Sequence, residues 1–469
     1  MTAHWDRRST SEHDRVENLA LARWLPSVAT FTSHWAHLAR HLGIDHHELD
    51  DRKDLDVFPT SRERDLIAAV GPSGAGLVLT PNEDQVKARA DTATLFTIAR
   101  SIRRGGQAGK RLALLEQYKP IHVHQRDAGA LSIAYSRADL DRLHLAGSRA
   151  ASVLGMDDSD YLVNAVPGGP SLDFWGVYHL GLGASILALH PRGHGDGLDA
   201  VVDAFHLLPT TAVAVALDDA IDLANLLAEA RATVDRVQRV ITVGPPPSDE
   251  VRSQISEAWS SAGAHADVRV RALWGPSEGR CLWAEQADSP GSLVTYGDLD
   301  VIEVVDALTG APTTGGGDLV ISSVGWNGTA LVRYQTGAWV DGITREPDPV
   351  TGRTAPRIMG DVIPDAWQPT ILTEAGPSRI DLRGVAATVA GFSSVGSWVV
   401  EVRKPTTRIK HDRVLVEVAG TLSESDRARL EGALPAALGV EPTSLNVHVD
   451  VHAVRARVDD LGSHFADLR

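Results

Sequence analysis

Two histidines and an arginine are spaced so that their side chains can act together. His122 and His124 lie two positions apart in the segment PIHVH, and Arg126 follows them. Side chains two apart on a strand point to the same face. There they could bind an anionic group or serve as an acid–base pair, because the pKa of histidine lies near neutrality. Hydrogen-bonded histidines at a strand end would give the same pattern, so both interpretations stay open.

Glu278 is a second candidate for chemistry. It lies in the segment LWGPSEGR (Leu273–Arg280), directly after an apolar run at 267–273 that is typical of a strand. Open α/β sheets bind ligands beyond the carboxyl ends of their parallel strands, so a glutamate there is well placed. The alternative is an ordinary strand-to-helix turn with an exposed glutamate. Cys281, three residues on, is expected to be packed and not reactive.

An alternation of strands and helices must position these residues. Helical stretches separate five apolar runs, which predict strands at 161–166, 184–189, 211–217, 237–243 and 267–273. Such an alternation favours parallel βαβ packing and an α/β fold. Ahead of it, residues 1–65 are expected to be helical, and Trp24–Ile44 carries apolar residues at helical spacing.

The pattern changes near Gly360. Beyond it the sequence predicts helices at 384–391 and 423–437, and strands at 397–403, 413–419 and 445–454. That is a compact α+β domain of about 110 residues. We therefore predict two domains, a large N-terminal one (1–359) and a small C-terminal one (360–469), as expected for a chain too long for one core.

Composition narrows the class of protein further. The chain has 469 residues, 43% of them hydrophobic, and 45 basic against 61 acidic residues give a net charge of −16. That charge opposes nonspecific binding to nucleic acid or an anionic membrane. One cysteine excludes an internal disulfide framework and a cysteine-based zinc cluster. With neither a secretory signal nor a membrane-spanning run in the sequence, we expect a cytoplasmic protein.

Two segments carry a resemblance to a known family. The sequences RYQTGA (Arg333–Ala338) and GRTAPRI (Gly352–Ile358) resemble the motifs RYRTGD and CGRTxPRI of adenylate-forming enzymes, within them the phenylacetate–CoA ligase branch. Tyr135–Leu140 (YSRADL) resembles the motif that follows the family's phosphate loop. The resemblance covers nearly the whole chain. It implies a large adenylate-forming domain with a small α+β lid domain.

The resemblance also implies site residues. LWGPSEGR resembles the motif YGxTE, which makes Glu278 the acid that contacts Mg²⁺ and, with Arg333, a catalytic candidate. His122 and His124 are the other catalytic candidates because of their spacing, not because of the resemblance. The implied nucleotide-binding positions are Trp274, Gly275, Ser277, Arg353 and Arg383. Phe174, Trp175 and Tyr178 would line the acyl pocket, although a helix packing its aromatic residues in the core is an equal alternative.

Five positions depart from the family pattern. The phosphate loop, Val123–Ala130, has one glycine and no hydroxyl, and the adenine-contacting turn, Gly244–Ser248, contains three prolines. Ala338 replaces the aspartate that holds the ribose, Asp361 replaces the hinge arginine, and no lysine follows Lys410 in the lid. Together these departures argue for weak or absent ATP binding.

Three functions therefore stay open. The first is a ligase that activates a small carboxylic acid with Mg²⁺ and ATP and transfers the acyl group to CoA, a carrier protein or an amine. The second is ATP-independent acyl transfer or condensation on an activated substrate, with His122, His124 and Glu278 as polar groups. The third is a noncatalytic partner or scaffold protein. The resemblance also suggests that the protein acts in specialised biosynthesis and that it forms a homodimer, as members of this branch often do.

Overall fold

The computed structural model describes residues 5–45, 48–49, 51–89, 115–126, 129–191, 197–307, 309–374, 376–392, 394–406, 410–448 and 465–468, with isolated positions between 96 and 106 and at 454. The chain forms two compact units. The first comprises Met1–Thr336 and Val340–Val362, and the second comprises Gly337–Trp339 and Ile363–Arg469. The sequence motifs placed the domain boundary at Gly360.

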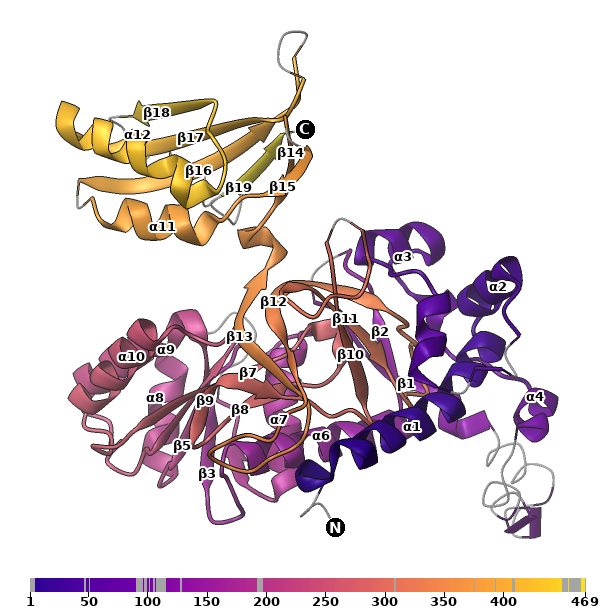
Figure 1. The fold of residues 1–469 in the computed structure, drawn as a ribbon. Helices are drawn as coiled ribbons and strands as arrows, with labels where there is room; N and C mark the ends of the chain where they lie inside the picture. Colours follow the sequence, from indigo (N-terminus) through magenta and orange to yellow (C-terminus); the bar gives the residue numbers. More distant parts are fainter. Residues whose placement is uncertain are drawn as a thin grey trace. The chain divides into compact units, whose positions relative to one another are not determined.

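A mixed sheet runs through the first unit in the strand order β10-β11-β12-β13-β9-β8-β7-β6-β5-β3-β4 (Figure 1). Its strands are β3 (Tyr161–Asn164), β4 (Leu187–Leu189), β5 (Ala212–Ala216), β6 (Arg239–Val243), β7 (Arg269–Trp274), β8 (Trp283–Gln286), β9 (Ser289–Val294), β10 (Asp300–Val305), β11 (Gly317–Ser323), β12 (Tyr334–Thr344) and β13 (Arg357–Pro364). From β4 to β7 neighbouring strands are parallel, and β8 and β9 continue the sheet antiparallel. The predicted α/β fold class is confirmed.

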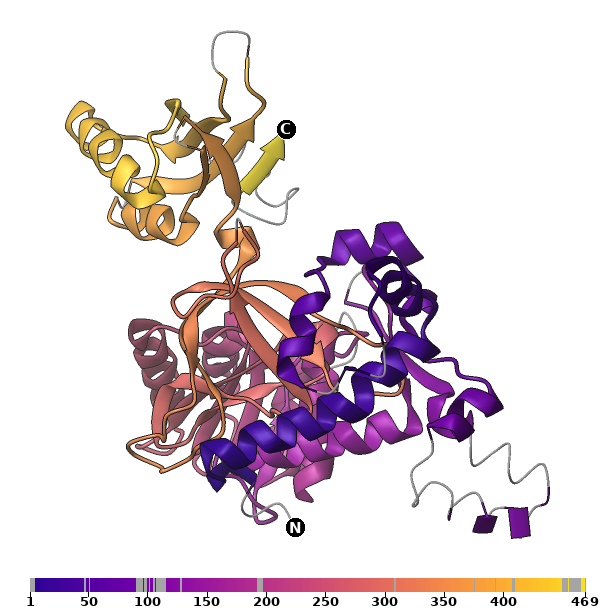
Figure 2. The ribbon, with the colours of Figure 1, turned by 45° about the vertical axis from the view of Figure 1, so that its right-hand side comes forward.

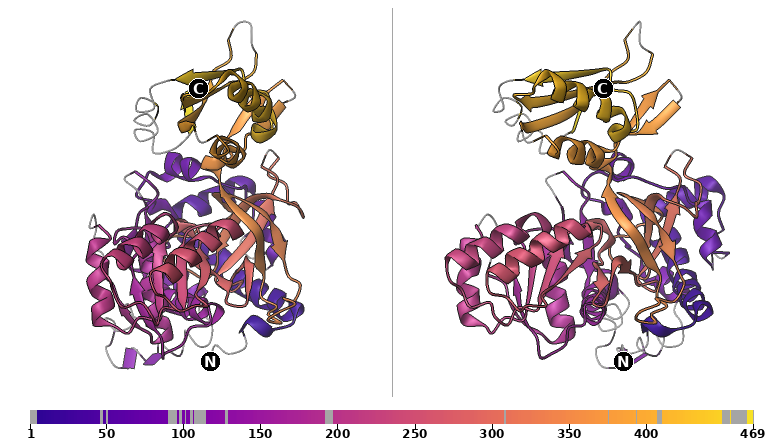
Figure 3. Two further views of the ribbon diagram at one scale, coloured as in Figure 1. Left: turned by 90° about the vertical axis from the view of Figure 1, so that its left-hand side faces the viewer. Right: turned by 60° about the vertical axis from the view of Figure 1, so that its left-hand side comes forward.

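Helices cover the parallel strands, which explains why the sequences of those strands are apolar. The helices of this unit are α1 (Thr10–Phe31), α2 (Ser33–Leu42), α3 (Glu63–Val70), α4 (Glu83–Ala88), α6 (Arg137–Val153), α7 (Leu172–Ala184), α8 (Asp199–Leu207), α9 (Ala220–Glu229) and α10 (Asp249–Ser261). Helices α8, α9 and α10 lie together against the strands (Figure 3), where Val213 and Val215 of β5 pack in one core with Leu223, Leu227 and Trp259. None of the described helices is both long and apolar enough to cross a membrane.

The N-terminal helices are two elements where the sequence pattern suggested one. Thr32 separates α1 from α2, because its backbone is extended and its hydroxyl accepts a hydrogen bond from the Trp35 amide, the N-cap arrangement. Figure 2 shows α1 running along the outside of the first unit. Its buried residues include Trp24, whose indole N–H donates to the Trp326 carbonyl oxygen at 3.1 Å. Helix α1 is therefore attached to the β-rich part of the unit.

In the described residues of the second unit, two helices pack on one face of a four-stranded sheet, and two further strands form a separate hairpin. Its elements are β14 (Thr370–Thr373), β15 (Gly376–Arg379), α11 (Leu382–Ala390), β16 (Val395–Arg403), β17 (Arg413–Gly420), α12 (Glu424–Leu438), β18 (Ser444–His448) and β19 (Phe465–Leu468), with the sheet in the order β18-β17-β16-β19. Alternate residues such as Val400 and Val416 pack against Val385 of α11 and Leu434 of α12. The expected small α+β domain is confirmed as a fold.

Candidate active site

A tight turn after β7 holds Glu278 in the interior. Gly275 has no room for a side chain, because a Cβ there would overlap the Cys281 carbonyl oxygen. The short helix η6 (Ser277–Gly279) follows, and Glu278 within it is only 2% exposed. The alternative of an exposed glutamate in an ordinary turn is therefore wrong. Trp274 and Ser277 flank this turn and are half-buried.

Arg126 neutralises the buried carboxylate. Its Nη1 lies 3.0 Å from Glu278 Oε1, and its Nη2 lies 2.9 Å from Glu63 Oε2 at the start of α3. The other oxygen of Glu63 accepts the Leu131 amide N–H at 2.8 Å. One guanidinium thus joins two carboxylates from distant segments. Asp127 and Ala128, the next residues of the expected phosphate loop, lie outside the described residues.

His122 and His124 share one face of their strand, as the sequence predicted. They lie on β1 (Pro120–His124), which pairs with β2 (Ile133–Ser136), and their ring centroids are 4.6 Å apart. His124 Nδ1 lies 3.0 Å from the Tyr135 hydroxyl, and its Nε2 has no hydrogen-bond partner among the described residues. Burial, aided by the charges of His122, His179 and Arg280, lowers the pKa of His124 to about 3. His124 is therefore neutral at physiological pH.

Aromatic residues of α7 stand beside the two histidines. The Trp175 ring stacks on His124 with centroids 5.9 Å apart and lies 5.3 Å from His122. Farther along, Phe174 and Tyr178 both contact the His190 ring, at 5.6 and 5.1 Å. All three predicted pocket residues are half-buried. The structure therefore brings the predicted acyl-pocket segment to the predicted acid–base pair.

Arg280 is a site residue that the sequence analysis missed. It has a left-handed backbone (φ 69°) and is completely buried, and its Nη2 donates to the Thr329 carbonyl oxygen. The guanidinium carbon lies 5.6 Å from the Tyr135 ring and 5.1 Å from the Trp326 ring, so cation–π contacts replace water around the charge. Burial lowers its pKa, and its charge disfavours protonation of His124. The sequence feature that could have identified Arg280 as a site residue is its position at the end of the segment GPSEGR.

The three remaining arginines of the prediction are paired elsewhere. Arg333 lies 3.2 Å from Glu303 of β10 and donates to the Phe58 carbonyl oxygen. Arg353 donates from Nε to Asp6 at 2.6 Å. Arg383 lies in the second unit, 3.7 Å from Asp381. Their contacts with a nucleotide stay predictions.

The proline-rich turn before α10 has a structural role. The Ser248 hydroxyl caps α10 by accepting the Val251 amide N–H at 3.3 Å. Arg252 Nη2 donates to the Pro247 carbonyl oxygen at 3.1 Å. The same guanidinium holds Glu285, which is fully buried, at 3.0 and 3.1 Å. This turn is thus fixed by a side chain that points into the core.

A preformed metal site does not fit these contacts. Glu278 Oε1 already accepts a hydrogen bond from the Arg126 guanidinium. Among the described residues there is no group of three or more histidine, cysteine, aspartate or glutamate side chains suited to a metal ion. A divalent cation at Glu278 would therefore have to compete with the Arg126 guanidinium.

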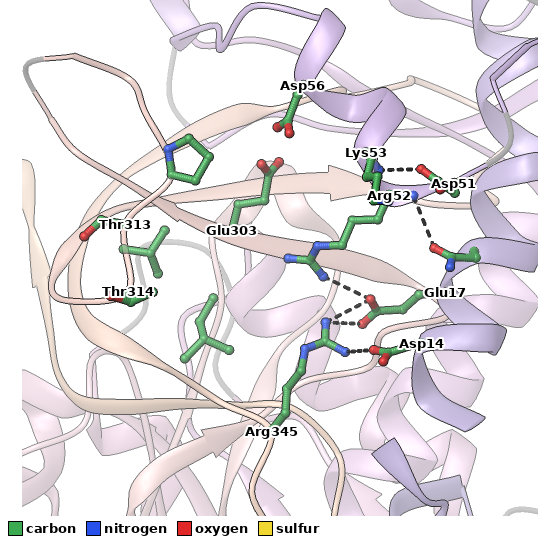
Figure 4. Close-up of a pocket in the computed structure, with 14 residues that line it drawn as sticks. Asp14, Glu17, Asp51, Arg52, Lys53, Asp56, Glu303, Thr313, Thr314 and Arg345 are labelled. Atoms are coloured by element: carbon green, nitrogen blue, oxygen red, sulfur yellow. Dashed lines mark hydrogen bonds and ion pairs between the residues drawn. The ribbon is translucent and has the colours of Figure 1, made fainter. Parts of the chain in front are cut away.

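A separate pocket of about 620 Å³ lies between α1, the turn η2 (Arg52–Val57) and strands β10 and β12 (Figure 4). Glu17 lies between two guanidinium groups there, 3.0 Å from Arg52 and 2.9 Å from Arg345. Arg345 also contacts Asp14 at 2.8 Å. None of the predicted site residues lines this pocket. Its paired charges hold α1 against the sheet.

Solved structures of one enzyme share this architecture. No protein-family model and no curated protein sequence matches the chain. 2-Hydroxyisobutyryl-CoA ligase in the postadenylation state, in complex with R3-HIB-AMP, aligns over 98% of this chain and 94% of its own, with TM-score 0.68 and 17% identity. Its open conformation with 2-HIB-AMP and CoA aligns over 96% and 91%, with TM-score 0.69 and 17% identity. The chain therefore shares the fold of this ligase over nearly its whole length, the fold that its motifs indicated.

Proposed function

We propose that this protein is a ligase that activates a small carboxylic acid as an acyl-adenylate and transfers the acyl group to a thiol or an amine. The supporting observation is the likeness along nearly the full length of both chains to a ligase solved with an acyl-adenylate and CoA. Both the large and the small domain of that architecture are present.

In this proposal the site residues have defined tasks. ATP would supply the adenylyl group and CoA or a carrier protein the thiol, and Glu278 would hold Mg²⁺ only after the Arg126 guanidinium had left its carboxylate. Trp274, Gly275 and Ser277 form the turn beside the nucleotide, and the apolar rings of Phe174, Trp175 and Tyr178 receive the acyl group. His124 lies beside the Trp175 ring and is neutral, so it would not attract the negative charge of the substrate carboxylate.

Calorimetric titration of Mg·ATP, followed by a carboxylic-acid screen for pyrophosphate release, tests the proposal. Binding of Mg·ATP at micromolar to submillimolar concentration, followed by pyrophosphate release that depends on the carboxylic acid, would support the proposal and show that the altered nucleotide contacts are replaced by others. No binding at millimolar ATP would overturn the ligase proposal.

The histidine geometry supports a second candidate, ATP-independent acyl transfer or condensation. The Nε2 of His124 has no hydrogen-bond partner among the described residues, so it is available to a nucleophile or an acyl oxygen, while the lowered pKa makes it a weak proton acceptor. Loss of turnover of an acyl thioester in His124→Gln, with substrate binding retained, would support it. Unchanged turnover in that variant would exclude it.

A further inference from the structure

Two carboxylates meet on opposite sides of the Arg126 side chain. Glu278 is 3% and Glu63 23% exposed at the side chain, whereas Arg126 is 44% exposed. The two glutamates come from the turn after β7 and from the first turn of α3. Glu63 is fixed in place by the Leu131 amide N–H. The arrangement therefore consists of two positioned anions and one cation on a long, solvent-accessible side chain.

Electrostatics explains why a cation must be present between them. A buried carboxylate such as Glu278 needs a compensating charge, and a second carboxylate on the same guanidinium increases that need. A guanidinium fork satisfies both through charge-assisted hydrogen bonds. A hard divalent cation uses the same carboxylate oxygens as ligands and completes its shell with water or phosphate oxygens. The two cations therefore exclude each other.

We propose that the Arg126 guanidinium occupies a latent divalent-cation site formed by Glu63 and Glu278, so that a metal ion binds there only when Arg126 is displaced. This inference rests on the proposed function only in assigning Glu278 to the nucleotide site. Glu63 is then a second metal ligand, and Arg126 sets the metal affinity of the site. The chain thereby carries its own inhibitor of metal loading.

Binding of Mn²⁺ to the full-length protein, followed by electron paramagnetic resonance, tests this directly. The wild type is expected to show no site tighter than about 1 mM, because the Arg126 guanidinium occupies the carboxylate oxygens that the ion would need as ligands. Arg126→Gln is expected to gain one site, roughly tenfold tighter or better, because the competing charge is gone. Adding Glu278→Gln or Glu63→Gln to Arg126→Gln should remove that site.

Matched variants separate this effect from general changes in charge. Arg427 forms an exposed pair with Glu431 at 3.0 Å, and Arg427→Gln should leave Mn²⁺ binding as in the wild type. The wild type and Glu278→Gln both keep Arg126, so the two proteins should give the same Mn²⁺ titration. A Mn²⁺ site in the wild type that Glu278→Gln removes would overturn the proposal. So would a folded Arg126→Gln protein that gains no site.

The result of the Mn²⁺ titration can be distinguished from the result of the test of the proposed ligase function. Pyrophosphate release reports on the ligase activity, whereas Mn²⁺ binding is measured without nucleotide or acid. Failure of every variant to release pyrophosphate would leave the Mn²⁺ result standing. Conversely, the wild type could release pyrophosphate and also bind Mn²⁺ at a site that depends on Glu278. That result would support the ligase function and would show that Arg126 does not block the metal site.

Discussion

His124 Nδ1 lies 3.0 Å from the Tyr135 hydroxyl, which joins the end of β1 to β2 through a neutral imidazole. Burial lowers the pKa of His124 to about 3 and that of His179 to about 4. In the unfolded chain both would take up a proton near pH 6.5. Below that pH the unfolded state binds more protons than the folded state, so the folded state loses stability as the pH falls toward these lowered values.

We expect His124→Gln to flatten this pH dependence. Each such histidine contributes at most about 1.4 kcal/mol per pH unit to the slope of the unfolding free energy. Urea unfolding between pH 4.5 and 7.5 measures it. Substitution of the exposed His206 by glutamine is the control and should keep the wild-type slope. An identical slope in His124→Gln would show that folding does not lower the pKa of His124, which would contradict the prediction.

Arg252→Ala is expected to destabilise the first unit by about 3–5 kcal/mol, because it leaves the fully buried Glu285 without its guanidinium. Thermal or urea unfolding would show the loss. The control, Arg427→Ala, breaks an exposed i,i+4 pair and should change stability by less than about 0.5 kcal/mol. A loss equally small in Arg252→Ala would mean that Glu285 finds another partner or is protonated.

Glu17→Gln tests the network in Figure 4. Glu17 is 4% exposed at the side chain and contacts both Arg52 and Arg345. Its neutralisation leaves two guanidinium groups facing each other, and because both are partly exposed we expect a loss of about 2 kcal/mol. Asp14→Asn, at a half-exposed side chain with one partner from the same Arg345, should cost less than about 1 kcal/mol. Equal losses in the two variants would contradict a central role for Glu17.

Ala338→Asp restores the residue that the family uses for the ribose, but we expect it to destabilise the protein. Ala338 is only 3% exposed, so the new carboxylate would be buried. A buried polar group without a partner costs about 1–3 kcal/mol. Ala338→Ser adds no charge and should cost less. A stable Ala338→Asp protein with tighter ATP binding would show that the nucleotide site survives and needs only this carboxylate.

Local patterns predicted most of the secondary structure. The apolar runs at 211–217 and 237–243 became β5 and β6, because a short strand buried on both faces has a continuous apolar sequence. Strand β19 (Phe465–Leu468) was missed, since its four residues carry no period and its place depends on parallel pairing with β16. The break at Thr32 was also missed, because both helices continue a similar apolar spacing across it.

The candidate site was only partly predictable. The shared face of His122 and His124 follows from strand periodicity, which is local. The ion pairs of Arg126 join residues 152 and 63 positions away, so no sequence pattern could predict them. The same holds for Arg353 and Asp6, which are 347 positions apart. Motifs locate a turn such as that of Glu278, but long-range charge pairing decides what the turn can bind.

The attachment of α1 also has a consequence for biosynthesis of the chain. Asp14 and Glu17 bind Arg345, and Asp6 binds Arg353, partners that are translated more than 300 residues later. At about 5–20 residues per second, the ribosome needs on the order of tens of seconds to reach them. During that time the apolar face of α1, with Leu21, Trp24 and Leu25, awaits its partners. Helix α1 thus leaves the ribosome long before these partners, and a chaperone that shields its apolar face in the meantime would increase the yield of folded protein.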